Sequence, residues 1–320
     1  MGGSVRSFAR HRESGRANRG NVVPMMIALQ AATPQLPRTK AVADQVVAVG
    51  ETDSTNALAA RMIGDGSLTL PECKGGTLAV GVVATDWQSA GRGRNGHTWI
   101  SQPGRCSTMS YAVRIPRAIA TDESVNGWLQ MIAGLVTLDA LNGMIKEYGA
   151  APNKQDCFLE LKWPNDVFCH GLKLGGLLSE LVLLPDGEAD DDDVVVVFGV
   201  GLNLALGASR LPTPQSTSLR LHVSGLPSFN EMRDAVAERE VEGFRERLAA
   251  FIADPHGQAE ALREEMKAVC WARGRQIEAH FTDGTTLIGE AIGLNEDASL
   301  ILRTGDGTDH TVRTADVGVL

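Results

Sequence analysis

The sequence lacks a positive balance of charge, since 39 acidic residues against 30 lysines and arginines give a formal net charge of −9. This balance disfavours binding of the whole chain to nucleic acid or to an anionic membrane. The five cysteines are odd in number and have no CxxC spacing, so neither a disulfide framework nor a zinc site is indicated. A reducing cytoplasm fits this cysteine content. No apolar run reaches the roughly 20 residues that span a bilayer.

What remains is a globular chain of 320 residues with 43% hydrophobic content, long enough for more than one domain. The first 40 residues differ from the rest, because five arginines lie between residues 6 and 19 and Glu13 is the only acid. Pro24 interrupts the apolar part, which disfavours a signal peptide, and the paired pattern of a helix-turn-helix is missing. We therefore expect residues 1–40 to be a disordered extension, or the result of an early start, with no role in DNA binding.

The most informative stretch is Gly91-Arg92-Gly93-Arg94-Asn95-Gly96-His97-Thr98-Trp99, between the strand-like runs Leu78–Ala84 and Cys106–Ile115. Its glycines let main-chain N–H groups come close to a ligand. Its arginines carry planar, permanently charged forks that suit carboxylate and phosphate oxygens. These properties predict an anion-binding loop between two strands. A solvated basic loop or a nucleic-acid-binding segment is the alternative that this motif alone leaves open.

Two other motifs also have a structural and a functional interpretation. Ser54, Thr55 and Asn56 stand where the N-cap of a helix over Ala57–Ile63 belongs, so they either cap that helix or face a neutral polar ligand group. Lys173 lies in an apolar, glycine-rich run, where it is either an edge-strand charge with a solvated end or a functional cation.

The remaining pattern predicts a mixed α+β protein. Helical spacing predicts helices over Ser124–Tyr148, Asn230–Ile252 and Gln258–Val269. Apolar runs predict strands over Val46–Val49, Leu159–Lys162, Val167–Cys169, Leu172–Leu184 and Val194–Leu204. The acidic loop Pro185–Asp193 is interpreted as solvated rather than as a calcium site. After Gly274, short strands over Ile277–Phe281, Thr286–Leu294, Leu300–Arg303 and His310–Arg313 predict a small SH3-like barrel.

Five motifs together resemble the biotin–protein ligase family, also called biotin–[acetyl-CoA carboxylase] ligases. They are Asp53-Ser54-Thr55-Asn56, Gln88 through Trp99, Lys162-Trp163-Pro164-Asn165-Asp166, Lys173-Leu174-Gly175-Gly176, and Gly199-Val200-Gly201-Leu202-Asn203. They occur in the order that the family shows and cover roughly Val46 to Asn203. Each motif alone is weak, whereas five in order at compatible spacings are specific.

The resemblance implies a mixed-sheet catalytic domain over residues 41–271 and an SH3-like C-terminal domain over residues 272–320. It implies the ligase-only class, without a DNA-binding domain. Such an enzyme uses ATP and Mg²⁺ to activate biotin as biotinoyl-5′-AMP and transfers it to a lysine of a biotin carboxyl carrier domain. The resemblance also implies a cytoplasmic protein without membrane contact, present as a monomer or weak homodimer.

Carried over residue by residue, the resemblance implies three overlapping sets of site residues. Biotin would contact Ser54, Thr55, Asn56, Gln88, Arg92, Gly93, Arg94, Lys173 and Gly176. ATP and the adenylate would contact Arg92, Arg94, Trp99, Lys162, Asn165 and Asn203. The catalytic groups would be Lys173, Arg92, Arg94 and Asp166, with Asp166 contacting Mg²⁺ or orienting the acceptor amine. Asn95 and His97 depart from the family pattern, so no phosphate contact is assigned to them.

Two other functions fit parts of the same pattern. A lipoate–protein ligase shares the fold and the adenylating chemistry that the resemblance implies, although the Gly-Arg-Gly-Arg loop and the Lys-Trp-Pro-Asn-Asp turn favour biotin. A non-catalytic protein that binds biotin or a nucleotide, or an RNA-binding module built on the C-terminal domain, is the alternative from another class. The acidic balance and the presence of Lys173 argue against that class.

Overall fold

The computed structural model describes residues 30–72, 77–154, 159–185 and 192–319. Its centre is a seven-stranded mixed sheet, ordered β1-β2-β3-β8-β7-β6-β5. The strands are β1 (Gln45–Thr52), β2 (Val80–Gln88), β3 (Cys106–Pro116), β5 (Leu159–Lys162), β6 (Asp166–Cys169), β7 (Leu172–Val182) and β8 (Asp193–Asn203). Only β1 and β2 pair in parallel, and the other neighbours are antiparallel. The predicted mixed sheet is therefore confirmed.

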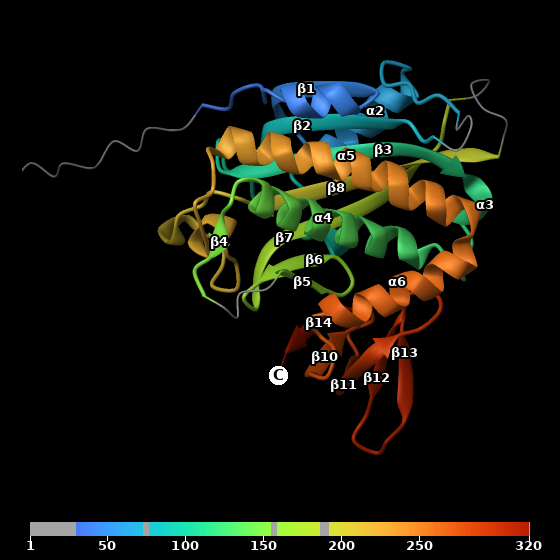
Figure 1. Cartoon of the computed structure of the whole chain (residues 1–320). Helices are drawn as coiled ribbons and strands as arrows, with labels where there is room; N and C mark the ends of the chain where they lie inside the picture. The colour runs from blue at the N-terminus through green and yellow to red at the C-terminus, as the bar shows by residue number, and fades with distance from the viewer. Residues whose placement is uncertain (1–29, 73–76, 155–158, 186–191, 320) are drawn as a thin grey trace, which may run out of the picture.

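Helices lie on both faces of this sheet (Figure 1). The long helices α4 (Gly127–Glu147) and α5 (Phe229–Ala253) cover one face, and α2 (Thr55–Gly64) lies on the other. Because side chains alternate along a strand, Val82 packs toward α4 and α5, whereas its neighbour Val83 packs toward α2. We call the first face the helix-covered face and the second the α2 face.

Helix α4 is long and apolar enough to cross a membrane by length and composition. However, 72% of its apolar window is buried inside the protein, and Trp128, Ile132 and Leu141 have no exposed surface. It is a core helix, in agreement with the core stripe that the sequence predicts over Ser124–Tyr148.

The C-terminal region follows α6 (Pro255–Val269) and lies below the large sheet in Figure 1. It is a five-stranded antiparallel sheet, ordered β13-β12-β11-β10-β14, in which β13 and β14 are edge strands. It contains β10 (Gln276–His280), β11 (Thr286–Leu294), β12 (Leu300–Arg303), β13 (Asp309–Val312) and β14 (Asp316–Val319). This sheet is compatible with an SH3-like domain, although its described strands do not close into a barrel. The first four strands were predicted and β14 was not, because its Asp and Gly disfavour a strand.

The two sheets are joined by specific contacts. The indole N–H of Trp128 donates to the carbonyl oxygen of Glu296 at 2.6 Å, and that of Trp163 donates to Ala298 at 3.0 Å. One continuous hydrophobic core includes α4, α5 and residues of the C-terminal strands. The C-terminal sheet is thus held in a fixed position beside the Trp163 turn.

The described fold includes residues before the predicted domain boundary at residue 40. Helix α1 (Pro37–Val42) packs on α5, and the backbone N–H and hydroxyl of buried Thr39 both donate to the Asp234 carboxylate. The end of the predicted extension therefore belongs to the fold, whereas residues 1–29 lie outside the described residues. Most of the predicted acidic loop, residues 186–191, also lies outside them.

The shorter elements connect these layers. They are α3 (Arg117–Ala120), β4 (Ala151–Pro152), β9 (Val223–Ser224) and three 3-10 turns at Arg94–Gly96, Ala208–Arg210 and Leu219–Leu221. Strands β4 and β9 pair with each other, and neither was predicted from the sequence.

Candidate active site

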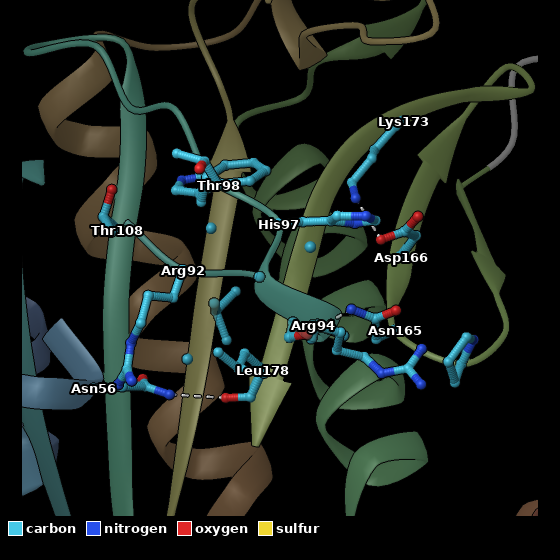
Figure 2. A pocket seen from close by; sticks show the side chains of 18 of the residues that line it. Asn56, Arg92, Arg94, His97, Thr98, Thr108, Asn165, Asp166, Lys173 and Leu178 are labelled. Carbon is cyan, nitrogen blue, oxygen red and sulfur yellow. Dashed lines mark hydrogen bonds and ion pairs between the residues drawn. The ribbon is translucent and has the colours of Figure 1, made fainter. Parts of the chain in front are cut away.

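A cavity opens on the α2 face, where β7 and β8 meet the Gly91–Trp99 loop and the last strand of the C-terminal sheet (Figure 2). Its empty volume, including the open mouth, is about 980 Å³. All five motifs contribute lining residues, although they are spread over about 150 positions of the chain.

The Gly91–Trp99 loop is closed at its base by main-chain hydrogen bonds. Trp99 N–H donates to the Gly91 carbonyl at 3.0 Å, and Gly93 N–H donates to the His97 carbonyl at 2.7 Å. A Cβ at position 91 would lie 2.4 Å from the Trp99 carbonyl oxygen, so only glycine fits there. The loop is an ordered turn that projects both arginine side chains.

The floor of the cavity is built from uncharged polar groups. The Ser54 hydroxyl accepts from Ala57 N–H and caps α2, while Ser54, Thr55 and Asn56 also line the cavity. Gln88 Oε1 accepts from Thr55 N–H at 2.8 Å. The capping and ligand-facing interpretations of this motif are therefore compatible, because one helix start serves both.

Two glycines of β8 leave room for this floor and for Trp99. A Cβ at Gly199 would lie 2.5 Å from Asn56 Oδ1, and a Cβ at Gly201 would lie 2.6 Å from the Trp99 ring. Trp99 Nε1 and Thr108 Oγ1 are buried beside the cavity and have no hydrogen-bond partner among the described residues. Both groups could therefore bind a polar ligand atom.

Positive charge gathers at the opposite side of the cavity. Lys173 Nζ lies 2.7 Å from Asp166 Oδ1, and Lys162 Nζ lies 4.0 Å from Asp166 Oδ2. Figure 2 shows Lys173 pointing at Asp166 across neighbouring strands. Burial lowers the pKa of Lys162, and Asp166 opposes that shift. The Lys173 side chain keeps 38% exposure, so it reaches the cavity from its apolar strand as a cation with an acidic partner.

Arg94 is held by the C-terminal sheet. Its Nη1 donates to the Ala315 carbonyl at 3.4 Å and lies 3.9 Å from Asp316 Oδ1. Asn95 Nδ2 donates to Asp316 Oδ2 at 3.2 Å. Burial lowers the pKa of Arg94, while Asp316 and Asp166 raise it. Arg94 is thus anchored to the C-terminal sheet, whereas Arg92 pairs with Glu180 of β7.

Of the residues expected at the site, all but Asn203 line this cavity. Asn203 is buried at the end of β8, where its Oδ1 accepts from the Cys106 thiol at 3.5 Å. Its contact with adenine stays a prediction. The roles assigned to the lining residues are likewise proposals, because the structure places their side chains without a ligand.

Three residues at this site, Asp316, Val317 and Glu180, were not predicted from the sequence. The first two line the cavity from β14, a strand that the pattern did not reveal, more than a hundred residues after the last motif. Glu180 forms an ion pair with Arg92 at 3.1 Å. No local signal could have singled out either carboxylate, because their proximity to the loop arises only from the tertiary structure.

Comparisons with known proteins agree with this arrangement. Residues 72–199 match the model of the biotin/lipoate A/B protein ligase family. A biotin–[acetyl-CoA-carboxylase] ligase of Mycobacterium tuberculosis is 27% identical over 273 residues, which cover 85% of this chain and 88% of that protein. The bifunctional ligase/repressor BirA of Bacillus subtilis is 26% identical over 74% of this chain, which spans 65% of that protein.

Solved structures share the fold. The biotin protein ligase of Aquifex aeolicus in complex with biotin and ATP superposes with a TM-score of 0.56 at 19% identity, covering 86% of this chain and 98% of that chain. Another structure of the ligase from the same organism gives a TM-score of 0.57 at 17% identity, with 87% and 100% coverage. Residues 72–199 therefore carry the features of a biotin/lipoate A/B protein ligase domain, and the chain is similar to biotin–protein ligases over most of its length.

Proposed function

We propose that this chain is an ATP-dependent biotin–protein ligase, which activates biotin to biotinoyl-5′-AMP and transfers the biotinoyl group to a lysine of a biotin carboxyl carrier domain. The observation that carries the proposal is one cavity in which a neutral hydrogen-bonding floor faces Arg94, Lys162 and Lys173. The floor suits the uncharged ureido ring of biotin. The cations suit its carboxylate and the phosphates of ATP.

In the first step, a carboxylate oxygen of biotin bonds to the α-phosphorus of ATP, and the bond to the leaving pyrophosphate breaks. Because both reactants are anions, the site must supply positive charge and in-line positioning more than covalent help. Lys173 and Arg94 supply that charge, and Lys162 adds to it from β5. Trp99, at the base of the loop, would contact the adenine.

Magnesium carried on the ATP phosphates fits the carboxylates of the cavity. Among the described lining residues these are Asp166 and Asp316. Mg²⁺ commonly binds one or two carboxylates together with substrate phosphates and water. The ion would neutralise phosphate charge, and Asp166 is the residue we expect nearest to it.

In the second step, the acceptor amine bonds to the carbonyl carbon of the mixed anhydride, AMP leaves, and the amine loses a proton. A free lysine has a pKa of about 10.4, so an acceptor close to the amine helps the attack. Asp166 is also our candidate for the hydrogen-bond acceptor that orients this amine. We further propose that Arg92 and Arg94 hold the loop over the adenylate and protect the anhydride from water.

The partner that follows from this activity is a biotin carboxyl carrier domain of an acyl-CoA carboxylase. We infer that the enzyme works in the cytoplasm as a monomer or weak homodimer, with neither DNA nor a membrane as a partner. The formal net charge of −9 supports the last two points, because it repels polyanionic surfaces.

ATP–pyrophosphate exchange tests the proposal when it is run separately with biotin, with lipoate and with neither. Exchange that depends on biotin is the expected result. Exchange with lipoate alone would assign the chain to the lipoate–protein ligases. Binding of biotin without exchange would leave a non-catalytic binding protein.

A further inference from the structure

Glu180, on β7, contacts the loop and the cavity floor at the same time, although it does not line the cavity. Its carboxylate forms an ion pair with Arg92 Nη2 at 3.1 Å and accepts from Asn56 Nδ2 at 2.7 Å. Figure 2 shows the Arg92 side chain directed toward Asn56, and both side chains contact the Glu180 carboxylate. None of the five motifs contains Glu180.

A chain of hydrogen bonds runs from Glu180 across the floor. Asn56 Nδ2 donates to Glu180 and also to the Leu178 carbonyl at 3.0 Å. The Ser110 hydroxyl donates to Asn56 Oδ1 at 2.6 Å and lies 2.7 Å from the Thr55 hydroxyl. The Thr55 hydroxyl lies 3.2 Å from Gln88 Oε1. Four elements and the loop are thus joined through one network.

Two acceptors at one end of the network, the Glu180 carboxylate and the Leu178 carbonyl, decide the direction of these hydrogen bonds. Because Glu180 and the Leu178 carbonyl only accept, Asn56 must turn its NH₂ group toward them and its Oδ1 toward Ser110. The single proton of Ser110 is then used at Asn56, and the Thr55 proton points to Ser110 or to Gln88 Oε1.

The other end of the network faces the ligand site. Gln88 Oε1 is occupied by Thr55 N–H, so Gln88 Nε2 turns its two N–H groups away from Thr55. A floor ordered in this way presents N–H donors to a ligand carbonyl oxygen. If the Asn56 amide were rotated to exchange its oxygen and nitrogen, Ser110 would lose its hydrogen-bond acceptor. The hydrogen-bond network of the floor would then be weaker.

We infer that Glu180 is a positioning residue, which together with the Leu178 carbonyl holds the Asn56 amide in the floor and also holds Arg92 above it. The inference rests on the proposed function in one respect, namely that the ligand carbonyl is that of biotin. Glu180 does not touch the ligand. Its ion pair with Arg92 is partly exposed, with side-chain exposures of 32% and 51%, so we expect little contribution to folding.

The variant Glu180→Gln keeps the size of the side chain but removes its charge and replaces one of its two acceptor oxygens with an N–H donor. The dissociation constant for biotin should rise roughly tenfold, the effect of losing about one hydrogen bond. The kcat of pyrophosphate exchange at saturating biotin and ATP should stay within about threefold, because Lys173 and Arg94 are unchanged. Glu260→Gln, an exposed carboxylate on α6, is the matched control and should change neither value.

Combination with Asn56→Ala distinguishes positioning from a general structural effect. If Glu180 acts through Asn56, the double variant should bind biotin about as weakly as Asn56→Ala alone. The inference would be overturned if the losses of biotin affinity in the two single variants added fully in the double variant. A lower kcat with unchanged biotin affinity in Glu180→Gln would overturn it as well.

Labelling of arginine by phenylglyoxal tests the hold on Arg92 without any ligand. In Glu180→Gln the labelling rate of Arg92, followed by peptide mass spectrometry, should rise about fivefold, as expected when a weak ion pair is lost. Arg94 is the internal reference, because the C-terminal sheet holds it, and its rate should not change. Unchanged labelling of Arg92 would contradict the inference. A wild-type protein that binds no biotin would instead contradict the proposed function, and the labelling result would still decide the role of Glu180.

Discussion

Two carboxylates on opposite faces of the large sheet, Glu180 and Glu240, lie in contrasting environments, and neighbouring residues of β3 show the difference. Ser110, on the α2 face, joins the network that ends at Glu180 and Arg92. Tyr111, on the helix-covered face, donates its hydroxyl to Glu240, which is 1% exposed and has no cationic partner among its described contacts. On the α2 face a carboxylate orders a cation and a binding floor. On the other face a carboxylate lies sealed in the core.

Burial decides what each carboxylate can do. Burial raises the pKa of Glu240 to about 7, although hydrogen bonds from Tyr111 and Thr137 favour the ionised form. Glu180 and Asp166 lie near solvent and near Arg92 and Lys173, so they form ion pairs. Substitutions on the helix-covered face should therefore change stability, whereas those at the cavity should change activity with little loss of stability. The four predictions below test this division.

The largest effect is expected at Glu240. The unfolded carboxyl releases its proton near pH 4.5 and the folded one near pH 7, so the unfolded state binds fewer protons between these values. The contribution of Glu240 to stability is complete below that range and is lost as the pH rises through it. The unfolding free energy of the wild type relative to Glu240→Gln should fall by about 3 kcal/mol over this range. Denaturant unfolding of both proteins at several pH values measures this difference in unfolding free energy. A difference that does not change with pH would contradict the raised pKa of the buried Glu240 carboxyl.

Lys173→Ala should lower the rate of adenylation by roughly 100-fold or more, which is the typical effect of removing one preorganised donor. The loss of stability should be small, because the side chain is 38% exposed. Pyrophosphate exchange and thermal unfolding measure the two effects. Lys146→Ala, an exposed lysine on α4, is the control. Wild-type exchange by a folded Lys173→Ala protein would show that this lysine is structural.

Arg94→Gly should separate the two steps of the reaction. A charge-assisted hydrogen bond is worth about 1.5–3 kcal/mol. Its loss should therefore speed escape of the adenylate by roughly 10- to 150-fold if loop opening controls escape. First-step chemistry should suffer less, because Lys173 and Lys162 remain. The protein is incubated with ATP, biotin and an unrelated lysine-rich protein, which is then probed for biotin. An unlabelled bystander, with pyrophosphate release confirmed, would show that Arg94 does not retain the adenylate.

The smallest effect is expected at Asp316, where the C-terminal sheet meets the loop. Asp316→Asn keeps the shape and removes one negative charge beside Arg94, at a separation of 3.9 Å and with 43% of the side chain exposed. An exposed pair of this kind is worth at most about 1 kcal/mol, so the KM for ATP should fall by up to about fivefold. Steady-state kinetics measure it. A higher KM would indicate that the carboxylate helps to bind the magnesium–nucleotide complex.

Most elements could be predicted from local pattern. The strand Leu159–Lys162 has the predicted bounds, and the helix over Ser124–Tyr148 differs from α4 by only a few terminal residues. The apolar residues of both elements recur with a regular period, and this period indicates the element type and its buried side. The motif residues could be predicted for a related reason. Glycine is required where the backbone packs closely against a neighbour, as at Gly91 and Gly201. Such glycines, like a cation in an apolar run, are uncommon at these positions and can be recognised in the sequence.

The sequence by itself thus determined the order of the main helices and strands and the mixed α+β class, and 13 of the 14 residues expected at the site line one cavity. Only the tertiary structure decided that β14 brings Asp316 to the loop, and that Glu180 joins Arg92 to Asn56. It also separated Asn203 from the cavity lining. The physical reason is that a carboxylate has no periodic signature, and its partner is decided by strand register and by the packing of two sheets. Those are long-range properties that no local pattern records.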